Sequence, residues 1–219
     1  MIQNNLYSKE AAVTKETFEQ NVNQLRSVLE VAPTLVVDVE TNGLDSFGTN
    51  QICGIGVGEP KNDGLTQYYP FRHHDGNNLS SESLQKLISL LNQLVQSYIG
   101  YNLKFDLHFL QNEGLSVLDK ELIDVIVMVR LIEHSDTKEL GLSATGKRNY
   151  GQEAIQYDDD TKKVLKANKG WFRDFSKAPA DILGEYCQED VRLTSRIYID
   201  YLKKIQDSNQ QDIFNMECK

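Results

Sequence analysis

The stretch TLVVDVETNGLD, residues 34–45, most constrains how this chain can fold. Its first half is too apolar for a half-exposed strand, so we expect it in the middle of a sheet. Asp38 and Glu40 follow at its end. Because alternate residues of a strand share a face, both carboxylates project to one side while Val37 and Val39 take the other. Two interpretations remain open at this point: a solvated strand end, and a pair of acids held together by a cation.

The cation interpretation has a physical basis. Two carboxylates on the same face of a strand, two residues apart, raise each other's pKa unless a positive charge lies between them. Their hard oxygen ligands suit Mg²⁺ or Mn²⁺. The stretch also imitates the start of a calcium-binding loop, but the twelfth position is Thr49 where a bidentate Glu is required, and a strand precedes it in place of a helix. The calcium loop is therefore set aside.

Two further acidic positions bear on the metal hypothesis. Asp106, in IGYNLKFDLHFL, is expected in the first turn of a helix, where acids are common. Its neighbours are apolar, however, and an unpaired carboxylate is costly in such surroundings. Tyr186 and Asp190, in EYCQEDVRLTSRIY, lie four residues apart and so share a helix face. Taken separately, each of these features is usually structural.

The periodicity of apolar residues predicts an α/β fold with a mixed central sheet. Three antiparallel strands come first, the second and third forming a hairpin within residues 51–71, and a short strand follows at 97–102. Helices are predicted over residues 14–31, 81–96, 103–113, 120–134 and 179–206, while residues 138–178 are expected to contain short helical pieces at most. No linker rich in Gly, Ser or Pro interrupts the chain, so we expect one domain over residues 1–219.

The composition argues against several classes of protein. The formal net charge of −9 disfavours broad electrostatic adhesion to nucleic acid or membranes, although residues 138–177 carry nine basic and six acidic side chains. No apolar run is long enough to span a bilayer, and the N-terminus lacks the pattern of a signal peptide. The cysteines at 53, 187 and 218 have no metal or disulfide spacing and fit a reducing compartment. We therefore expect a cytoplasmic protein that makes no membrane contact.

The three acidic motifs are far more specific together than apart. The D-x-E at a strand end, the Asn102, Phe105 and Asp106 group at a strand-to-helix junction, and the Y-x-x-x-D on a late helix occur in a fixed order. In this order and spacing they resemble the exonuclease motifs of the DEDDy branch of the DnaQ-like superfamily. The chain looks most similar to the 3′-to-5′ proofreading domain of family A DNA polymerases, the polymerase I type. The resemblance covers nearly the whole chain and implies an RNase H-like fold.

The resemblance also implies roles for individual residues. Asp38, Glu40, Asp106 and Asp190 would hold two Mg²⁺ ions, with Mn²⁺ as a substitute, on the scissile phosphate at a 3′ end. Tyr186 would orient the attacking water, whose deprotonation the metal drives. The substrate-binding positions that it implies are Thr41, Leu44, Asn102 and Phe105.

The leading prediction is a 3′-to-5′ exodeoxyribonuclease that releases nucleoside 5′-monophosphates from single-stranded or frayed DNA ends. Only 29 residues follow Asp190, too few for a polymerase domain, so we expect either an independent exonuclease or a proofreading module. The DNA polymerase that such a module serves is either a separate protein acting in trans or a part removed from this chain. Two alternatives remain: an RNase D-like exoribonuclease with the same motifs, and a non-catalytic module that binds nucleic acid or a polymerase. No chemistry is assigned to the histidines at 73, 74, 108 and 134, and the acids at 158–160 are expected to begin a helix.

Overall fold

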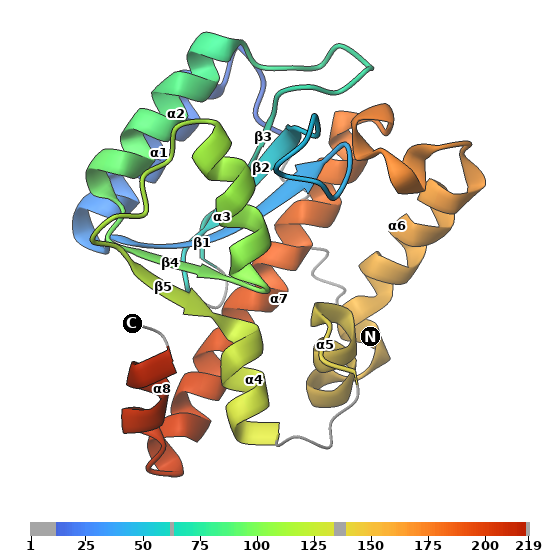
Figure 1. The fold of residues 1–219 in the computed structure, drawn as a ribbon. Helices are drawn as coiled ribbons and strands as arrows, with labels where there is room; N and C mark the ends of the chain where they lie inside the picture. Colours follow the sequence, from blue (N-terminus) through green and yellow to red (C-terminus); the bar gives the residue numbers. More distant parts are fainter. Residues whose placement is uncertain (1–11, 62–63, 134–138, 218–219) are drawn as a thin grey trace, which may run out of the picture.

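A computed structural model describes residues 12–61, 64–133 and 139–217, which form helical layers around a five-stranded sheet (Figure 1). The strands are β1 (Thr34–Thr41), β2 (Ile52–Gly58), β3 (Thr66–Pro70), β4 (Ser97–Gly100) and β5 (Glu121–Asp124). Their order in the sheet is β3-β2-β1-β4-β5. The pairs β1–β2 and β2–β3 are antiparallel, whereas β1–β4 and β4–β5 are parallel. The predicted mixed sheet with a central first strand is therefore confirmed.

Helices pack on both faces of the sheet. One face is covered by α1 (Phe18–Val31), α2 (Ser81–Leu94) and α3 (Leu103–Asn112). The other is covered by α4 (Val125–Glu133) and the long α7 (Ala180–Asp207). α8 (Gln211–Glu217) packs against α4 and α7, and α5 (Leu142–Tyr150) and α6 (Gln156–Ala167) lie beside α7. None of the helices in these described ranges is long and apolar enough to cross a membrane.

The alternation of side chains along β1 decides which way its acids point. Val37 and Val39 are buried in the core beneath α1, α2 and α3, whereas Val36 is buried in the core with α7. Asp38 and Glu40 follow Val36 at intervals of two residues, so they lie on the α7 side of the sheet. This register confirms the predicted separation of the valines from the two acids.

Close contact between α7 and β2 depends on a glycine. A Cβ atom at Gly56 would lie 2.5 Å from Cys187 Sγ and 3.2 Å from a methyl carbon of Val191, both on α7. Because real Cβ atoms do not approach other atoms so closely, any larger residue at this position would push the helix away from the sheet. Gly56 also pairs with Asp38 on the neighbouring strand, so it brings α7 next to the acids of β1.

Part of the prediction for residues 120–134 is wrong. Its beginning, Glu121–Asp124, forms the edge strand β5 on β4, and the helix starts only at Val125. Periodicity cannot distinguish a short apolar strand from a helix, and the free edge of β4 decides in favour of the strand. The first helix also begins later than predicted, at Phe18, and Thr14 instead caps the turn before it. His134 lies outside the described residues.

The prediction of short helical pieces at most for residues 138–178 is also wrong, because α6 runs for 12 residues. The only fully buried side chains on α6 are Asp158 and Leu165, so the apolar periodicity that would mark a helix is weak. α8 was likewise not predicted. The helices predicted at 81–96, 103–113 and 179–206 are confirmed as α2, α3 and α7. Lys138, the first residue of the predicted basic segment, lies outside the described residues.

Candidate active site

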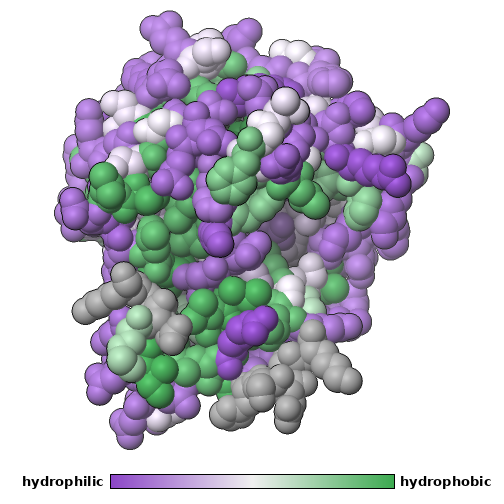
Figure 2. Space-filling model, viewed as in Figure 1, coloured by the Kyte–Doolittle hydropathy of each residue, from purple (hydrophilic) through white to green (hydrophobic). Residues whose placement is uncertain are grey.

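The predicted acids come together from three elements. Asp38 and Glu40 extend from the end of β1, Asp106 from the first turn of α3, and Asp190 from the middle of α7. Figure 2 shows that the surface is hollowed between α3 and α6, over the middle of α7. The packing of α7 on the sheet thus brings together the first and the last acid, which are 152 residues apart in the sequence.

Asp106 is tied directly to β1. Its side chain is buried, and its Oδ1 accepts a hydrogen bond from the backbone N–H of Val39 at 3.0 Å, between the two acids of the strand. The turn before α3 has Asn102 in the left-handed conformation, with φ of 62°, and the Asn102 N–H donates to Asp124 Oδ1 at 2.9 Å. This turn directs the first residues of α3 towards β1, which explains why Asp106 occupies an apolar neighbourhood.

All four acids have raised pKa values. Burial raises the pKa of Asp38 to about 6, although a hydrogen bond from Cys187 works in the opposite direction. Burial also raises the pKa of Glu40, and the charges of Asp38, Asp190 and Asp106 raise it further. Burial and the charge of Asp38 raise the pKa of Asp106 and of Asp190 in the same way. The carboxylates therefore destabilise one another, and a divalent cation between them would reverse this effect.

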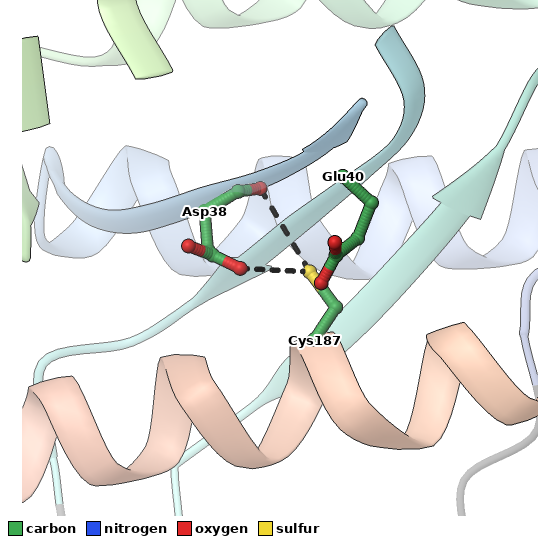
Figure 3. A group of neighbouring side chains, drawn as sticks. All are labelled: Asp38, Glu40 and Cys187. Carbon is green, nitrogen blue, oxygen red and sulfur yellow. Dashed lines mark hydrogen bonds between the residues drawn. The ribbon is translucent and has the colours of Figure 1, made fainter. Parts of the chain in front are cut away.

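Cys187 is a part of the site to which the sequence analysis assigned no role. Its Sγ lies 3.3 Å from Asp38 Oδ2, and the hydrogen bond between them is the dashed line from Cys187 to the Asp38 carboxylate in Figure 3. One ligand atom each from Asp38, Glu40 and Cys187 lie within 4.8 Å of one another. Burial raises the pKa of the thiol well above its ordinary value, so it remains a protonated donor to Asp38. The available signal was its position three residues before Asp190, which places both on one helix face.

α6 contributes two more residues that the sequence analysis did not assign to the site. The Tyr157 hydroxyl donates to Asp190 Oδ1 at 2.5 Å, and the Tyr186 hydroxyl donates to Asp158 Oδ1 at 3.2 Å. The two tyrosine rings lie 6.0 Å apart between their centroids. Asp158 does lie in the first turn of α6, as predicted for the acid run, but it is buried. The sequence marked the start of a helix here, but neither its full length nor its place beside α7, so the contacts of Tyr157 and Asp158 with α7 were not foreseen.

The predicted substrate-binding residues have different surroundings. Thr41 is buried, and its hydroxyl donates to the carbonyl of Gly43 at 2.7 Å. Leu44, in the loop after β1, is 84% exposed and available to a ligand. Asn102 forms the cap position before α3, and Phe105 is partly buried against the core. Thr41 and Leu44 thus lie at the end of the strand that carries Asp38 and Glu40.

The other residues weighed from the sequence have structural surroundings. His73 is buried, with Nε2 2.8 Å from the Tyr68 hydroxyl and Nδ1 2.9 Å from the carbonyl oxygen of Ala178. Trp171 and Phe175 pack against the buried cluster at the start of α7. Through these contacts Phe175 anchors the start of α7.

With the fold and the site described, comparison with known proteins shows the family. The model of the RNase H superfamily matches residues 35–216, so the chain belongs to that superfamily. A DNA polymerase I from a Synechocystis strain is 25% identical over 177 residues, covering 80% of this chain and 17% of the polymerase. A DNA-directed DNA polymerase of Pseudomonas phage M6 is 26% identical over 211 residues, covering 87% of this chain and 30% of that protein. The chain thus spans less than a third of the polymerases that it matches.

Solved structures share the fold at low identity. The Nibbler EXO domain of Aedes aegypti is 12% identical with a TM-score of 0.55, and covers 95% of this chain and 94% of that one. The catalytic core of RRP6 from Trypanosoma brucei is 15% identical with a TM-score of 0.57, covering 95% and 53%. The S. pombe Pop2p structure, with Mg²⁺ and Mn²⁺ bound, is 14% identical with a TM-score of 0.50, covering 87% and 90%. The predicted kinship with 3′-to-5′ exonuclease domains of the DEDD type is confirmed.

Proposed function

We propose that this chain is a metal-dependent 3′-to-5′ exonuclease domain that acts on DNA ends. The observation that carries the proposal is the convergence of Asp38, Glu40, Asp106 and Asp190 at the end of β1, with the pKa of each carboxyl raised. A fold gains nothing in stability from four mutually repelling acids. Such a cluster is expected where cations and a substrate supply the compensating charge.

The four carboxylates fit divalent metal ions. They supply only hard oxygen ligands, which Mg²⁺ and Mn²⁺ prefer, and we propose that they hold two such ions. Two ions, when bound, stabilise both the attacking and the leaving oxygen of an in-line displacement at phosphorus. The Pop2p structure of similar fold contains Mg²⁺ and Mn²⁺, which supports the choice of metal.

The remaining residues of the site would position the reactants. Tyr186 orients the water whose oxygen bonds to phosphorus, while the bond from phosphorus to the 3′ oxygen of the preceding nucleotide breaks and that oxygen gains a proton. The products are a nucleoside 5′-monophosphate and a strand shortened by one nucleotide. Thr41 and Leu44 hold the terminal nucleotide. Leu44 is exposed and offers an apolar surface to its base. Asn102 and Phe105, in the turn into α3, support the 3′ end of the nucleic-acid strand.

DNA is the favoured substrate because the matching sequences are DNA polymerases. This also supports a role in proofreading for a DNA polymerase. A specific observation favours a second candidate, an exoribonuclease: the RNase domain of the yeast Pop2 protein shares the fold with a TM-score of 0.50. The four acids and the tyrosine suit the phosphate chemistry of either polymer.

The deciding experiment incubates the chain with matched 5′-labelled DNA and RNA strands in Mg²⁺, in Mn²⁺ or in chelator. We expect DNA to shorten stepwise from its 3′ end with metal and to remain intact with chelator or with the Asp38→Ala variant. Faster loss of RNA would select the second candidate. If neither polymer is degraded with any metal, the proposed function is wrong.

Metal binding is tested separately from activity. Because a ligand that binds only the folded state raises the melting temperature, Mg²⁺ or Mn²⁺ should stabilise the wild type and leave Asp38→Ala unchanged. Equal stabilisation of both proteins would show that the cations bind elsewhere.

A further inference from the structure

Two tyrosines and two aspartates form a crossed arrangement between α6 and α7. Tyr157 on α6 donates to Asp190 on α7, while Tyr186 on α7 donates to Asp158 on α6. Each helix therefore supplies one donor and one acceptor to the other. The arrangement joins two segments that are 28 residues apart at the Tyr186–Asp158 contact.

Asp158 is held firmly where it meets Tyr186. Its side chain is buried, with 2% of the residue exposed, and its two oxygens have different partners. Oδ1 accepts from the Tyr186 hydroxyl at 3.2 Å, and Oδ2 accepts from Lys162 Nζ at 2.7 Å, one helical turn further along α6. The ion pair with Lys162 offsets the cost of burying this carboxylate. The position of Asp158 is thus set by α6 itself, independently of the acids on β1.

The direction of the Tyr186 hydroxyl has a chemical consequence. A tyrosine hydroxyl has one proton to donate and lone pairs that accept. In the structure that proton points to Asp158, an acceptor outside the four-acid cluster. Asp190 lies near as well, and the Tyr186 hydroxyl lowers its pKa, but Oδ1 of Asp190 already accepts from Tyr157. If Asp190 served as a metal ligand, Asp158 would remain as the acceptor for the Tyr186 proton.

We propose that Asp158 is a positioning residue for the hydrolysis. By accepting the proton of Tyr186, it leaves the tyrosine oxygen as an acceptor towards the attacking water. The water then donates a hydrogen bond to the Tyr186 oxygen. In this orientation a lone pair of the water oxygen faces phosphorus. A Tyr186 hydroxyl free to rotate would present its proton to the water in part of the molecules and orient it wrongly. This inference rests on the proposed exonuclease function and assigns a role to α6 within it.

A double-mutant cycle tests the proposal. We expect Asp158→Ala to lower kcat about tenfold with little change in KM, because the group acts on orientation and not on strand binding. Tyr186→Phe should lower kcat by at least as much. The double variant should be no slower than Tyr186→Phe, since Asp158 acts only through that hydroxyl. If the two losses multiply instead, Asp158 acts by another route and the proposal is wrong.

Two comparisons exclude a merely structural role. Asp160→Ala removes the same charge two residues along α6 and also breaks a lysine ion pair, with Lys163 at 3.0 Å, but Asp160 faces solvent and should leave kcat unchanged. Asp158→Asn keeps an acceptor oxygen for Tyr186 and should recover most of the activity that Asp158→Ala loses. A loss in Asp158→Asn as large as in Asp158→Ala would contradict the proposal.

A further measurement separates this inference from the proposed function. The rise in melting temperature with Mg²⁺ should be the same in Asp158→Ala as in the wild type, and its disappearance would show that Asp158 acts on the metal site. If Asp158→Ala does not fold, Asp158→Leu keeps the branched shape with no acceptor and replaces it in the cycle. A wild type that degrades neither polymer defeats both proposals, whereas an active wild type with multiplying losses defeats only this one.

Discussion

The Tyr157 hydroxyl lies 2.5 Å from Asp190 Oδ1 and donates its proton to it. This contact connects α6, which carries few buried apolar residues, to the most C-terminal acid of the site. It uses one oxygen of the carboxylate and leaves the other for a ligand. Hydrogen bonds of this kind orient metal-binding side chains and influence metal affinity.

Tyr157→Phe should therefore raise the metal requirement. Without the hydroxyl, Asp190 loses a donor that fixes its rotamer, and we expect the Mg²⁺ concentration for half-maximal activity to rise about tenfold. A Mg²⁺ titration of the exonuclease rate measures this change. Tyr150→Phe is the matched control, because Tyr150 donates to Asp200 at 2.7 Å in a Tyr–Asp pair that the proposal does not place in the site. An unchanged requirement in Tyr157→Phe would show that Asp190 needs no such support.

The stability of the metal-free protein should depend on the charge of Asp38. Its pKa is raised from 3.8 to about 6, mainly by burial. Because the folded state binds this proton more tightly than the unfolded state, the contribution of Asp38 to stability is complete below about pH 4 and is lost as pH rises through about 6. In chelator, we expect this loss to lower the melting temperature by about 5 °C between pH 4 and pH 7.

The Asp38→Asn variant isolates this contribution from that of the other carboxyls. Asp38→Asn lacks the titrating group. In chelator, its melting temperature relative to that of the wild type should therefore rise between pH 4 and pH 7. With saturating Mg²⁺ at pH 7, the wild type should instead have the higher melting temperature, since only the wild type keeps the full set of metal ligands. Parallel pH profiles for the two proteins in chelator would refute the buried-charge argument.

Leu44→Ala should impair activity without loss of stability. The Leu44 side chain is 84% exposed, so its truncation removes little packing from the folded protein. If it contacts the terminal base, kcat/KM on single-stranded DNA should fall about fivefold, corresponding to roughly 1 kcal/mol of base contact. Leu118 is 79% exposed on a different loop, and Leu118→Ala should change neither property. Equal activity of the two variants would remove Leu44 from the substrate-binding residues.

Gly56→Ala should impair both stability and activity. The added Cβ would meet Cys187 Sγ at 2.5 Å, and Cys187 itself contacts Asp38. Overpacking of this kind costs about 1 to 3 kcal/mol, which urea denaturation can measure. Gly141→Ala is the control, because a Cβ at Gly141 meets nothing within 4 Å. A Gly56→Ala variant with wild-type stability would mean that α7 can shift without cost.

The sequence by itself determined the central strand, the register of its acids and the family. Asp38 and Glu40 share a face because side chains alternate along any strand, and the hairpin and the helices with strong apolar stripes follow from equally local rules. The motif around Asp106 and the Tyr186–Asp190 spacing were recognisable for the same reason. Each depends only on residues within a few positions of one another.

Tertiary structure alone decided the features that depend on contacts distant in sequence. Residues 121–124 became a strand because the edge of β4 was available to pair with them. α6 has too few buried apolar side chains for its full length to be predicted from periodicity, and its place beside α7 depends on the folded surface that it meets. The partnerships of Tyr157 with Asp190 and of Asp158 with Tyr186 arise only there, because hydrogen bonds between distant segments leave no periodic pattern in the sequence.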